Sequence, residues 1–355
     1  MAATSSGCGA ASCRPTLAAM TAPASERTRF VLGENNVWPL RLAASEGGGW
    51  LLVDAGLEHR GAEGGPWWDL LLDQARAAGV RPEEVRAVLV THEHFDHAGL
   101  AARWAGLGAR ILAGPAALPT LALGFEAYER ARLPRLADLE RHGAPADLLA
   151  LWANRRPTSA WQWEACPEGA LEPVEDGATF RLDDGTTLRV VAAPGHTPGN
   201  LVALVEETSE LFSGDTLIPT TIPTPGLHYP GAVIGDADAP RWPSLPPFLR
   251  SIATIRTLGV VRVFPGHGDI IESPEVFLGR FETHHARRGA KARAALAYLE
   301  QATAYEIVRS IFPRLTEHRV FQAMTEVLGH LDLLAERGEA SGAGTPTRWK
   351  LTDGR

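Results

Sequence analysis

A cluster of histidines directly after a buried strand constrains this chain more than any other part of its sequence. The apolar run VRAVLV, residues 85–90, is typical of a strand buried on both faces, and the segment THEHFDHAG follows it. That segment contains His92, His94, Asp96 and His97. Alternate residues of an extended or tightly turned segment point the same way, so one short loop can supply ligands to two metal ions. Imidazole and carboxylate ligands suit zinc, iron or manganese rather than calcium.

Three further candidate ligands occur in similar settings, each after a predicted strand and beside glycine. They are His196 in APGHTPGN, Asp215 in FSGDTL and His267 in FPGHG. One such residue alone is more often a turn residue satisfied by local hydrogen bonds. All the candidates together suffice for two metal sites that share a bridging carboxylate. The sequence therefore predicts a binuclear metal centre.

The spacing of apolar residues predicts a layered architecture with a helical C-terminal region. Between residues 29 and 272, short apolar segments bounded by Gly, Pro and Asn alternate with helical patterns, which indicates an α/β domain. Residues from about 115 to 167 have helical spacing instead, and we interpret them as a helical insertion over one edge of that domain. Residues 273–355 are predicted to form three helices and a small hairpin, an order typical of a winged helix.

The motifs LLVDAG, THEHFDHAG, APGHTPGN, FSGDTL and FPGHG, in this order, resemble those of the metallo-β-lactamase fold superfamily over about residues 29–272. The resemblance implies a four-layer αββα sandwich with the metal ions at one edge. It implies that one ion is held by His92, His94 and His196. It implies that the other is held by Asp96, His97 and His267, with Asp215 as the bridge. Asp54 is then expected to support the ligands without binding metal, although a turn-capping role before Gly56 is an alternative.

The predicted ligand set implies a hydrolytic mechanism. Two divalent ions about 3.5–4 Å apart lower the pKa of a shared water toward about 7, and the hydroxide attacks a carbonyl or phosphoryl centre. We expect zinc, with iron or manganese as alternatives. Asp96, beside the nucleophile, is expected to orient the water and to help move its proton to the leaving group. Asp96 and Asp54 are thus the predicted catalytic carboxylates of a metal-dependent hydrolase.

Asp215, at the bridging position of the family pattern, narrows the range of possible substrates. By the resemblance, an Asp at this position favours the hydroxyacylglutathione hydrolase, lactonase and nuclease branches of the superfamily over antibiotic hydrolysis. The C-terminal segments TAYEIVRSIF and VLGHLDLLAERGE also resemble the winged-helix region of a group that includes a lactamase-like endoribonuclease. A thioester or ester hydrolase with a small-molecule substrate is the preferred interpretation. The alternative is an endoribonuclease or phosphodiesterase, and a third hypothesis is a DNA-binding regulator with a vestigial hydrolase domain.

Two groups of residues are candidates for the walls of a substrate pocket. His228 and Tyr229, in the Pro-rich segment after Asp215, could donate to a substrate oxygen or could pack on the proline loop. The aromatic residues of the insertion could cap the pocket or could form the core of the insertion itself. These aromatic residues are Phe125, Tyr128, Trp152, Trp161 and Trp163.

Charge and composition bear on partners and location. The formal net charge is -8, and the predicted last helix carries Glu326 and Asp332 besides Arg319, so no DNA partner is expected and RNA stays an alternative. The apolar stripe of that helix predicts packing on the preceding helix or in a homodimer. Few cysteines and the absence of a long apolar run predict a cytoplasmic protein without a membrane partner. Residues 1–28 are predicted to be a disordered tail, with a natural start at Met20 as an alternative.

Overall fold

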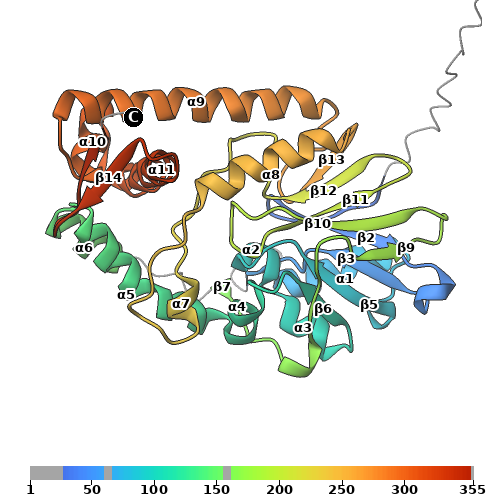
Figure 1. Ribbon diagram of the computed structural model, residues 1–355. Helices are drawn as coiled ribbons and strands as arrows, with labels where there is room; N and C mark the ends of the chain where they lie inside the picture. Colours follow the sequence, from blue (N-terminus) through green and yellow to red (C-terminus); the bar gives the residue numbers. More distant parts are fainter. Residues whose placement is uncertain (1–26, 60–65, 155–160, 353–355) are drawn as a thin grey trace, which may run out of the picture.

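Two β-sheets lie face to face with helices on their outer faces, and a group of helices flanks one end of this sandwich (Figure 1). The structure is a computed structural model, and it describes residues 27–59, 66–154 and 161–352, without the side chains of 161 and 162. The predicted tail therefore lies outside the described residues, except for Arg27 and Thr28. Arg27 forms an ion pair with Glu210 against the second sheet.

The first sheet has six strands in the order β1-β2-β3-β5-β6-β8. Their bounds are β1 Phe30–Leu32, β2 Asn35–Arg41, β3 Trp50–Val53, β5 Val85–Val90, β6 Arg110–Ala113 and β8 Leu171–Pro173. Strands β3, β5, β6 and β8 are parallel, so their carboxyl ends meet at one edge. The apolar run of β5 is buried on both faces, as its sequence predicts. Two helices, α1 (Trp67–Ala77) and α3 (Ala101–Gly106), cover the outer face.

The second sheet has five strands in the order β13-β12-β11-β10-β9. Their bounds are β13 Arg262–Pro265, β12 Glu210–Gly214, β11 Leu201–Val205, β10 Thr187–Ala192 and β9 Thr179–Arg181. Helices α8 (Leu245–Thr257) and α9 (Pro274–Leu299) pack on its outer face, and the inner faces of the two sheets share a core. The layers are thus helix, sheet, sheet and helix, as expected for the αββα sandwich.

The remaining elements are short pieces around the sandwich and the two helical regions. The short pieces are β4 Glu58–His59, β7 Trp161–Gln162, α2 Phe95–Ala98, α7 Pro230–Val233 and the 3₁₀ turns Ala44–Glu46, Pro82–Glu84 and Glu168–Ala170. The insertion forms α4 Leu118–Leu123, α5 Phe125–Arg141 and α6 Ala146–Ala153. The C-terminal region forms α10 Ala304–Ile311, α11 Glu317–Glu336, β14 Ala340–Ala343 and β15 Arg348–Leu351. These helices and the β14-β15 hairpin follow the predicted order.

A separate apolar core joins the insertion to the C-terminal helices. Leu139 and Trp152 of the insertion share it with Leu296, Ile307 and Leu328 of α9, α10 and α11. The ring of Trp152 lies 5.5 Å from that of Phe321 on α11. The insertion therefore packs on the C-terminal region as well as on the edge of the sandwich that the sequence predicted.

The apolar stripe of helix α11 is buried against other helices of the same chain. Met324, Leu328 and Leu331 are fully buried, and the helix packs on α8, α9 and α10. Arg241 forms a bidentate ion pair with Asp332, which ties α11 to the segment before α8. The predicted packing on the preceding helix is thus present. No described helix has the length and apolar character needed to cross a membrane.

Trp38 on β2 should be a main source of stability where the two sheets meet. Its ring lies 5.1 Å from that of Phe264 and 6.1 Å from that of Phe212, and its indole donates to the carbonyl of Pro265. We expect Trp38→Ala to lower the free energy of unfolding by about 3–5 kcal/mol in urea titrations followed by circular dichroism. Trp38→Phe should cost clearly less, because Asn36 also donates to that carbonyl. Equal losses in the two variants would contradict a packing role.

Candidate metal centre

All seven predicted metal ligands lie at one edge of the sandwich, on segments that follow strands. The fold brings them together because β5, β10, β12 and β13 all end at this edge. His92 and His94 follow β5, whereas Asp96 and His97 lie in α2. The other three each follow a strand of the second sheet, and they are His196, Asp215 and His267.

Three imidazole nitrogens converge in the first group of donors. His94 Nδ1 lies 3.1 Å from His92 Nε2 and 3.0 Å from His196 Nε2. Burial, followed by the neighbouring histidines, lowers the pKa of His92 well below its usual value and that of His94 to about 3. Burial also lowers the pKa of His196. Neutral imidazoles whose nitrogens face one another at this distance are suited to share one cation.

The second group of donors combines imidazoles with a carboxylate. His267 Nε2 lies 3.1 Å from His97 Nε2 and 3.4 Å from Asp96 Oδ2. Burial opposes a charge on His97, but the carboxylates of Asp215, Asp54 and Asp96 together raise its pKa well above the usual value. Burial also opposes a charge on His267, but hydrogen bonds with Asp215 and Asp96 raise its pKa to about 9. The carboxylates thus create a strongly negative field in which a cation is favourable.

Asp215 lies between the two groups. Its Oδ1 is 3.2 Å from His97 Nε2, and its Oδ2 is 3.6 Å from His196 Nε2. The Oδ1 atom is buried and has no hydrogen-bond partner among the described residues. A buried carboxylate oxygen without a donor is costly unless a cation compensates it. The imidazoles and carboxylates around it are donors of the kind that transition-metal ions take in proteins, so these residues could hold metal.

Asp54 orients one imidazole of each donor group through the ring nitrogen that points away from the other donors. Its Oδ2 accepts from His97 Nδ1 at 2.8 Å, and its Oδ1 accepts from the Thr91 hydroxyl at 2.8 Å. The hydroxyl gives its hydrogen to Asp54, so it accepts from His92 Nδ1 at 3.1 Å. Because their Nδ1 atoms donate these hydrogen bonds, His92 and His97 each direct Nε2 toward the other donors of their own group. The sequence analysis did not single out Thr91, although it belongs to the same motif.

Two glycines permit this close arrangement. A Cβ atom on Gly266 would lie 2.5 Å from the ring of His97 and 3.0 Å from Asp215 Oδ1, so any side chain there would displace a donor. Gly214 has a φ of 49°, and a Cβ atom there would lie 2.4 Å from the Thr91 hydroxyl. The glycines beside Asp215 and His267 in the sequence thus serve close packing as well as turns.

Comparison with known proteins agrees with this geometry. The model of the metallo-beta-lactamase superfamily matches residues 33–267. The chain belongs to the metallo-β-lactamase superfamily. The probable metallo-hydrolase YqjP of Bacillus subtilis is 26% identical over 309 residues, or 86% of this chain and 89% of that protein. A crystal structure of a superfamily protein from Thermus thermophilus is 28% identical, has a TM-score of 0.67, and covers 91% of this chain and 97% of its own.

A further relative has a named activity. The atrochrysone carboxyl ACP thioesterase of Aspergillus fumigatus is 23% identical over 276 residues, which cover 75% of this chain and 65% of that protein. The resemblance that the motifs suggested is therefore confirmed at the level of the superfamily and its hydrolase character.

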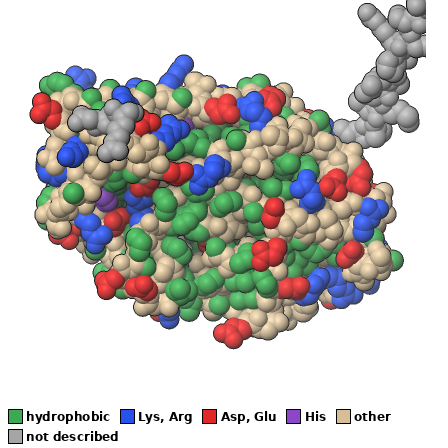
Figure 2. All heavy atoms as spheres, viewed as in Figure 1, with side chains coloured by type: hydrophobic (Ala, Val, Ile, Leu, Met, Phe, Trp, Pro, Cys, Tyr) green, Lys and Arg blue, Asp and Glu red, His purple; other side chains and the backbone are tan. Residues whose placement is uncertain are grey.

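A large cavity opens beside the donor groups of this superfamily member. It measures about 790 Å³ and is lined by His94 and Asp96, by α5, by the loop before α7 and by Phe321 of α11. Most of the other lining side chains are apolar, and Figure 2 shows hydrophobic side chains in a band across the middle of one face. Three structural regions thus meet at one cavity: the metal-binding loops, the insertion and the C-terminal helices.

The two predicted substrate-binding residues line this cavity, but their donors are already engaged. The imidazole of His228 stacks beside that of His94, and its Nε2 donates to the carbonyl of His196 at 2.7 Å. The hydroxyl of Tyr229 donates to Asp138 at 3.0 Å. Donation to a substrate oxygen stays a prediction, and it would require these hydrogen bonds to be exchanged. Both residues shape the wall of the cavity.

The aromatic residues of the insertion divide between the cavity and the core. Tyr128 and Trp163 line the cavity, as the capping interpretation predicts. Trp152 is buried in the core shared with the C-terminal helices, whereas Phe125 is 38% exposed. The side chain of Trp161 lies outside the described part of the chain.

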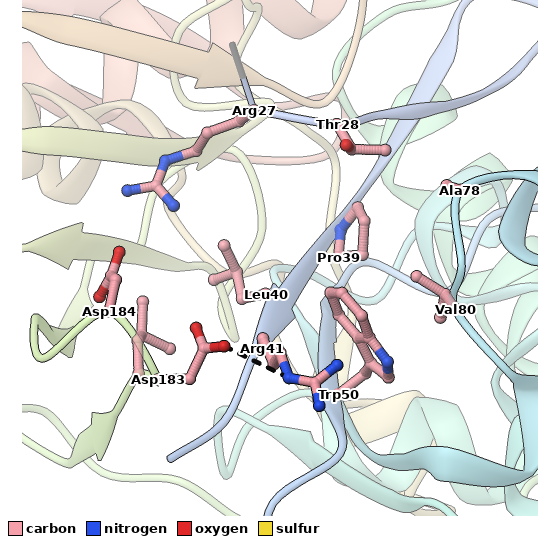
Figure 3. Close-up of a pocket in the computed structure, with 11 residues that line it drawn as sticks. Arg27, Thr28, Pro39, Leu40, Arg41, Trp50, Ala78, Val80, Asp183 and Asp184 are labelled. Atoms are coloured by element: carbon pink, nitrogen blue, oxygen red, sulfur yellow. Dashed lines mark ion pairs between the residues drawn. The ribbon is translucent and has the colours of Figure 1, made fainter. Parts of the chain in front are cut away.

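A second cavity, of about 210 Å³, lies at the opposite ends of the strands (Figure 3). Trp50, which lines it, begins β3, whereas Asp54 follows the other end of that strand. Arg41 and Asp183 form an ion pair of 3.3 Å on its wall. Among the described residues, none of the groups able to hold a metal ion lies there. Three of the groups that could hold a metal ion in the described part of the chain lie at the other edge, and a fourth, made of His284, His285 and Glu326, joins α9 to α11.

The metal content of the purified protein should report the two donor groups. We expect about two equivalents of transition metal by plasma mass spectrometry, because the donors outnumber those that one tetrahedral ion can use. Asp215→Ala should lower the occupancy of both sites, whereas His196→Ala should empty mainly one. A single tightly bound ion in the wild type, unaffected by loss of Asp96 or His267, would contradict two sites.

Asp54 should matter for metal affinity although it is expected to bind no metal itself. We expect Asp54→Asn to weaken metal binding about 10–100-fold in chelator competition, since the amide cannot accept equally from His97 and Thr91. Asp183→Asn at the opposite end of the sandwich is the matched control and should leave the affinity unchanged. If Asp54 only capped the turn before Gly56, the two variants would retain the same metal affinity.

Proposed function

We propose that the protein is a binuclear metal-dependent hydrolase that cleaves a small thioester, or an ester of similar shape. The observation that carries this proposal is the pair of donor groups, joined by Asp215, that opens directly into the apolar cavity. The hydrolase character of the superfamily supports the reaction class. The cavity supports a substrate with a substantial apolar part.

The residues of the donor groups would hold two divalent ions, for which we propose zinc. Such ions, when bound, supply a nucleophile from water at neutral pH and polarise the substrate oxygen. Asp54 keeps His92 and His97 in the required tautomers through their Nδ1 atoms. Asp96 lines the cavity. Burial would raise the pKa of its carboxyl group, but His97, His267 and His94 outweigh this effect and hold the pKa below the usual value. Its carboxylate Oδ2 can therefore accept a hydrogen bond from a reacting water and orient that water.

The described lining of the cavity lacks three of the side chains that commonly form acyl-enzyme intermediates. Within the described part of the chain, the residues that line it include neither serine, cysteine nor lysine. Cys166 is buried outside the cavity, and burial raises the pKa of its thiol to about 12. A covalent acyl-enzyme route is therefore not expected, and we propose direct attack of water on the substrate carbonyl.

The lining of the cavity favours a thioester over RNA. An RNA backbone requires several cationic contacts, whereas the apolar walls of the cavity suit an acyl chain. The named activity of the Aspergillus relative, a thioesterase, points to the same bond type. The C-terminal region, whose helices and hairpin have the order of a winged helix, contributes Phe321 to the cavity. We propose that it shapes the site and binds no DNA.

A substrate panel tests the bond type. We expect the metal-loaded protein to hydrolyse acyl thioesters and to lose this activity on dialysis against a chelator, with recovery when zinc is restored. S-lactoylglutathione, acyl-coenzyme A thioesters, lactones and single-stranded RNA make up the panel, and kcat/KM is measured for each. Faster cleavage of RNA than of any thioester or ester by the same preparation would overturn the proposal.

A further inference from the structure

Arg135 places a positive charge in the otherwise apolar wall of the cavity beside the donor groups. It lies on α5, whose residues Tyr128, Ala131 and Arg135 all line the cavity. Their spacing of three and four residues puts them on one face of the helix. The same cavity is lined by His94 and Asp96. Any molecule that fills the space between the donor groups and α5 therefore meets this guanidinium.

The other arginines of α5 have carboxylate partners. Arg130 pairs with Glu126 at 3.1 Å, Arg132 with Glu129 at 3.4 Å, and Arg141 with Asp138 at 3.8 Å. Within the residues that the structure describes, Arg135 has no ion pair and contacts the ring of Tyr128, 5.6 Å from its centroid. It differs from the other arginines of α5 because it lines the cavity and they do not.

The nearest acidic residue along the helix is already neutralised. Asp138 accepts from Arg241 at 3.2 Å and from the Tyr229 hydroxyl at 3.0 Å. Burial lowers the pKa of Arg135, and the groups that act against this effect are tyrosines, not carboxylates. A guanidinium among aromatic and apolar walls is poorly solvated and gains from an anion that enters the cavity.

We propose that Arg135 binds a carboxylate carried by the substrate, so that the preferred thioester is anionic at a position away from the bond that is cleaved. The proposal rests on the proposed function, since it assigns the substrate class of the same site. A planar guanidinium offers paired donors that match a carboxylate, and such charge-assisted hydrogen bonds are strong in a partly desolvated cavity. Arg135 is thus a specificity-determining residue that leaves the reacting atoms to the donor groups.

Two pairs of substrates test the acyl part and the thiol part, and the first pair also separates charge from size. Two thioesters of N-acetylcysteamine, succinyl and succinamoyl, differ only by a carboxylate or an amide at the end of the acyl part. Butyryl-N-acetylcysteamine and S-butyrylglutathione share an acyl part, but only the second has carboxylates on its thiol part. We expect Arg135→Met to lower kcat/KM about tenfold or more for succinyl-N-acetylcysteamine or S-butyrylglutathione, mainly through KM. The substrate that is affected shows which part carries the carboxylate.

Controls separate recognition from folding. The neutral substrates should change less than about twofold in Arg135→Met, and Arg135→Lys should recover part of the lost activity. Arg141→Met, on the same helix but 57% exposed, should treat all four substrates as the wild type does. Metal content should be unchanged in Arg135→Met and Tm should fall only slightly, because the variant loses the contact with the Tyr128 ring but no ion pair. Equal losses on charged and neutral substrates, or no loss on either, would overturn the proposal.

Binding provides a second readout if the wild type hydrolyses none of the thioesters, in which case the proposed function itself fails. Calorimetric titration of the metal-loaded protein then compares α,ω-dicarboxylates of increasing length with their monoamides. One carboxylate of each can reach the metal ions, so only the second reports the far subsite. We expect the wild type to prefer a dicarboxylate about tenfold and Arg135→Met to lose that preference. No preference in the wild type at any length would overturn the proposal.

Discussion

The arrangement of the metal centre depends on one buried carboxylate. Asp54 is 1% exposed, and its two oxygens reach His97 directly and His92 through Thr91, so a single side chain orients one ligand in each donor group. Its φ of 66° is unusual for a residue other than glycine, and such backbone persists only where the surrounding structure holds it. The parallel neighbours β3 and β5 supply that constraint, since Asp54 and Thr91 follow their carboxyl ends. Changes in the packing of the first sheet should therefore alter the position of an imidazole in each donor group.

The cavity exists because two hydrophobic cores meet beside this edge. The sandwich supplies the donor groups, and the second core, formed by the insertion and the C-terminal helices, supplies the opposite wall. Asp138 and Arg241 join the parts of that wall, because Arg241 binds both Asp138 on α5 and Asp332 on α11. The loops with the donor groups and the helical wall of the cavity thus belong to different packing units. If the proposed function holds, substitutions in the helices would change substrate preference without altering the donor groups.

Charge is distributed differently on the two sides of the cavity, the edge of the sandwich and the helical wall. Carboxylates and imidazoles crowd the edge of the sandwich, where their mutual fields hold the pKa of Asp96 low and that of His267 high. The helical wall is apolar, and its cation is Arg135. Within the described lining of the cavity, Arg135 is the arginine that lies beside this negative edge, and the proposed preference for an anionic substrate rests on that pairing of charges.

The sequence by itself predicted the α/β layers and their strands and marked seven candidate ligands, because buried strands, turn residues and ligand side chains are encoded locally, and the four-layer sandwich followed from the resemblance of the motifs. It also indicated Asp54, through the strand that precedes it. Tertiary structure alone decided which donors are already used. For His228 and Tyr229 the sequence left two roles open, donation to a substrate or packing on the proline loop. In the structure the carbonyl of His196 and the carboxylate of Asp138, far away along the chain, accept from them. In the sequence, Arg135 does not differ from the other arginines of α5. Only the folded structure shows that it lines the cavity without an ion pair among the described residues, because contacts between distant segments are not specified by local spacing.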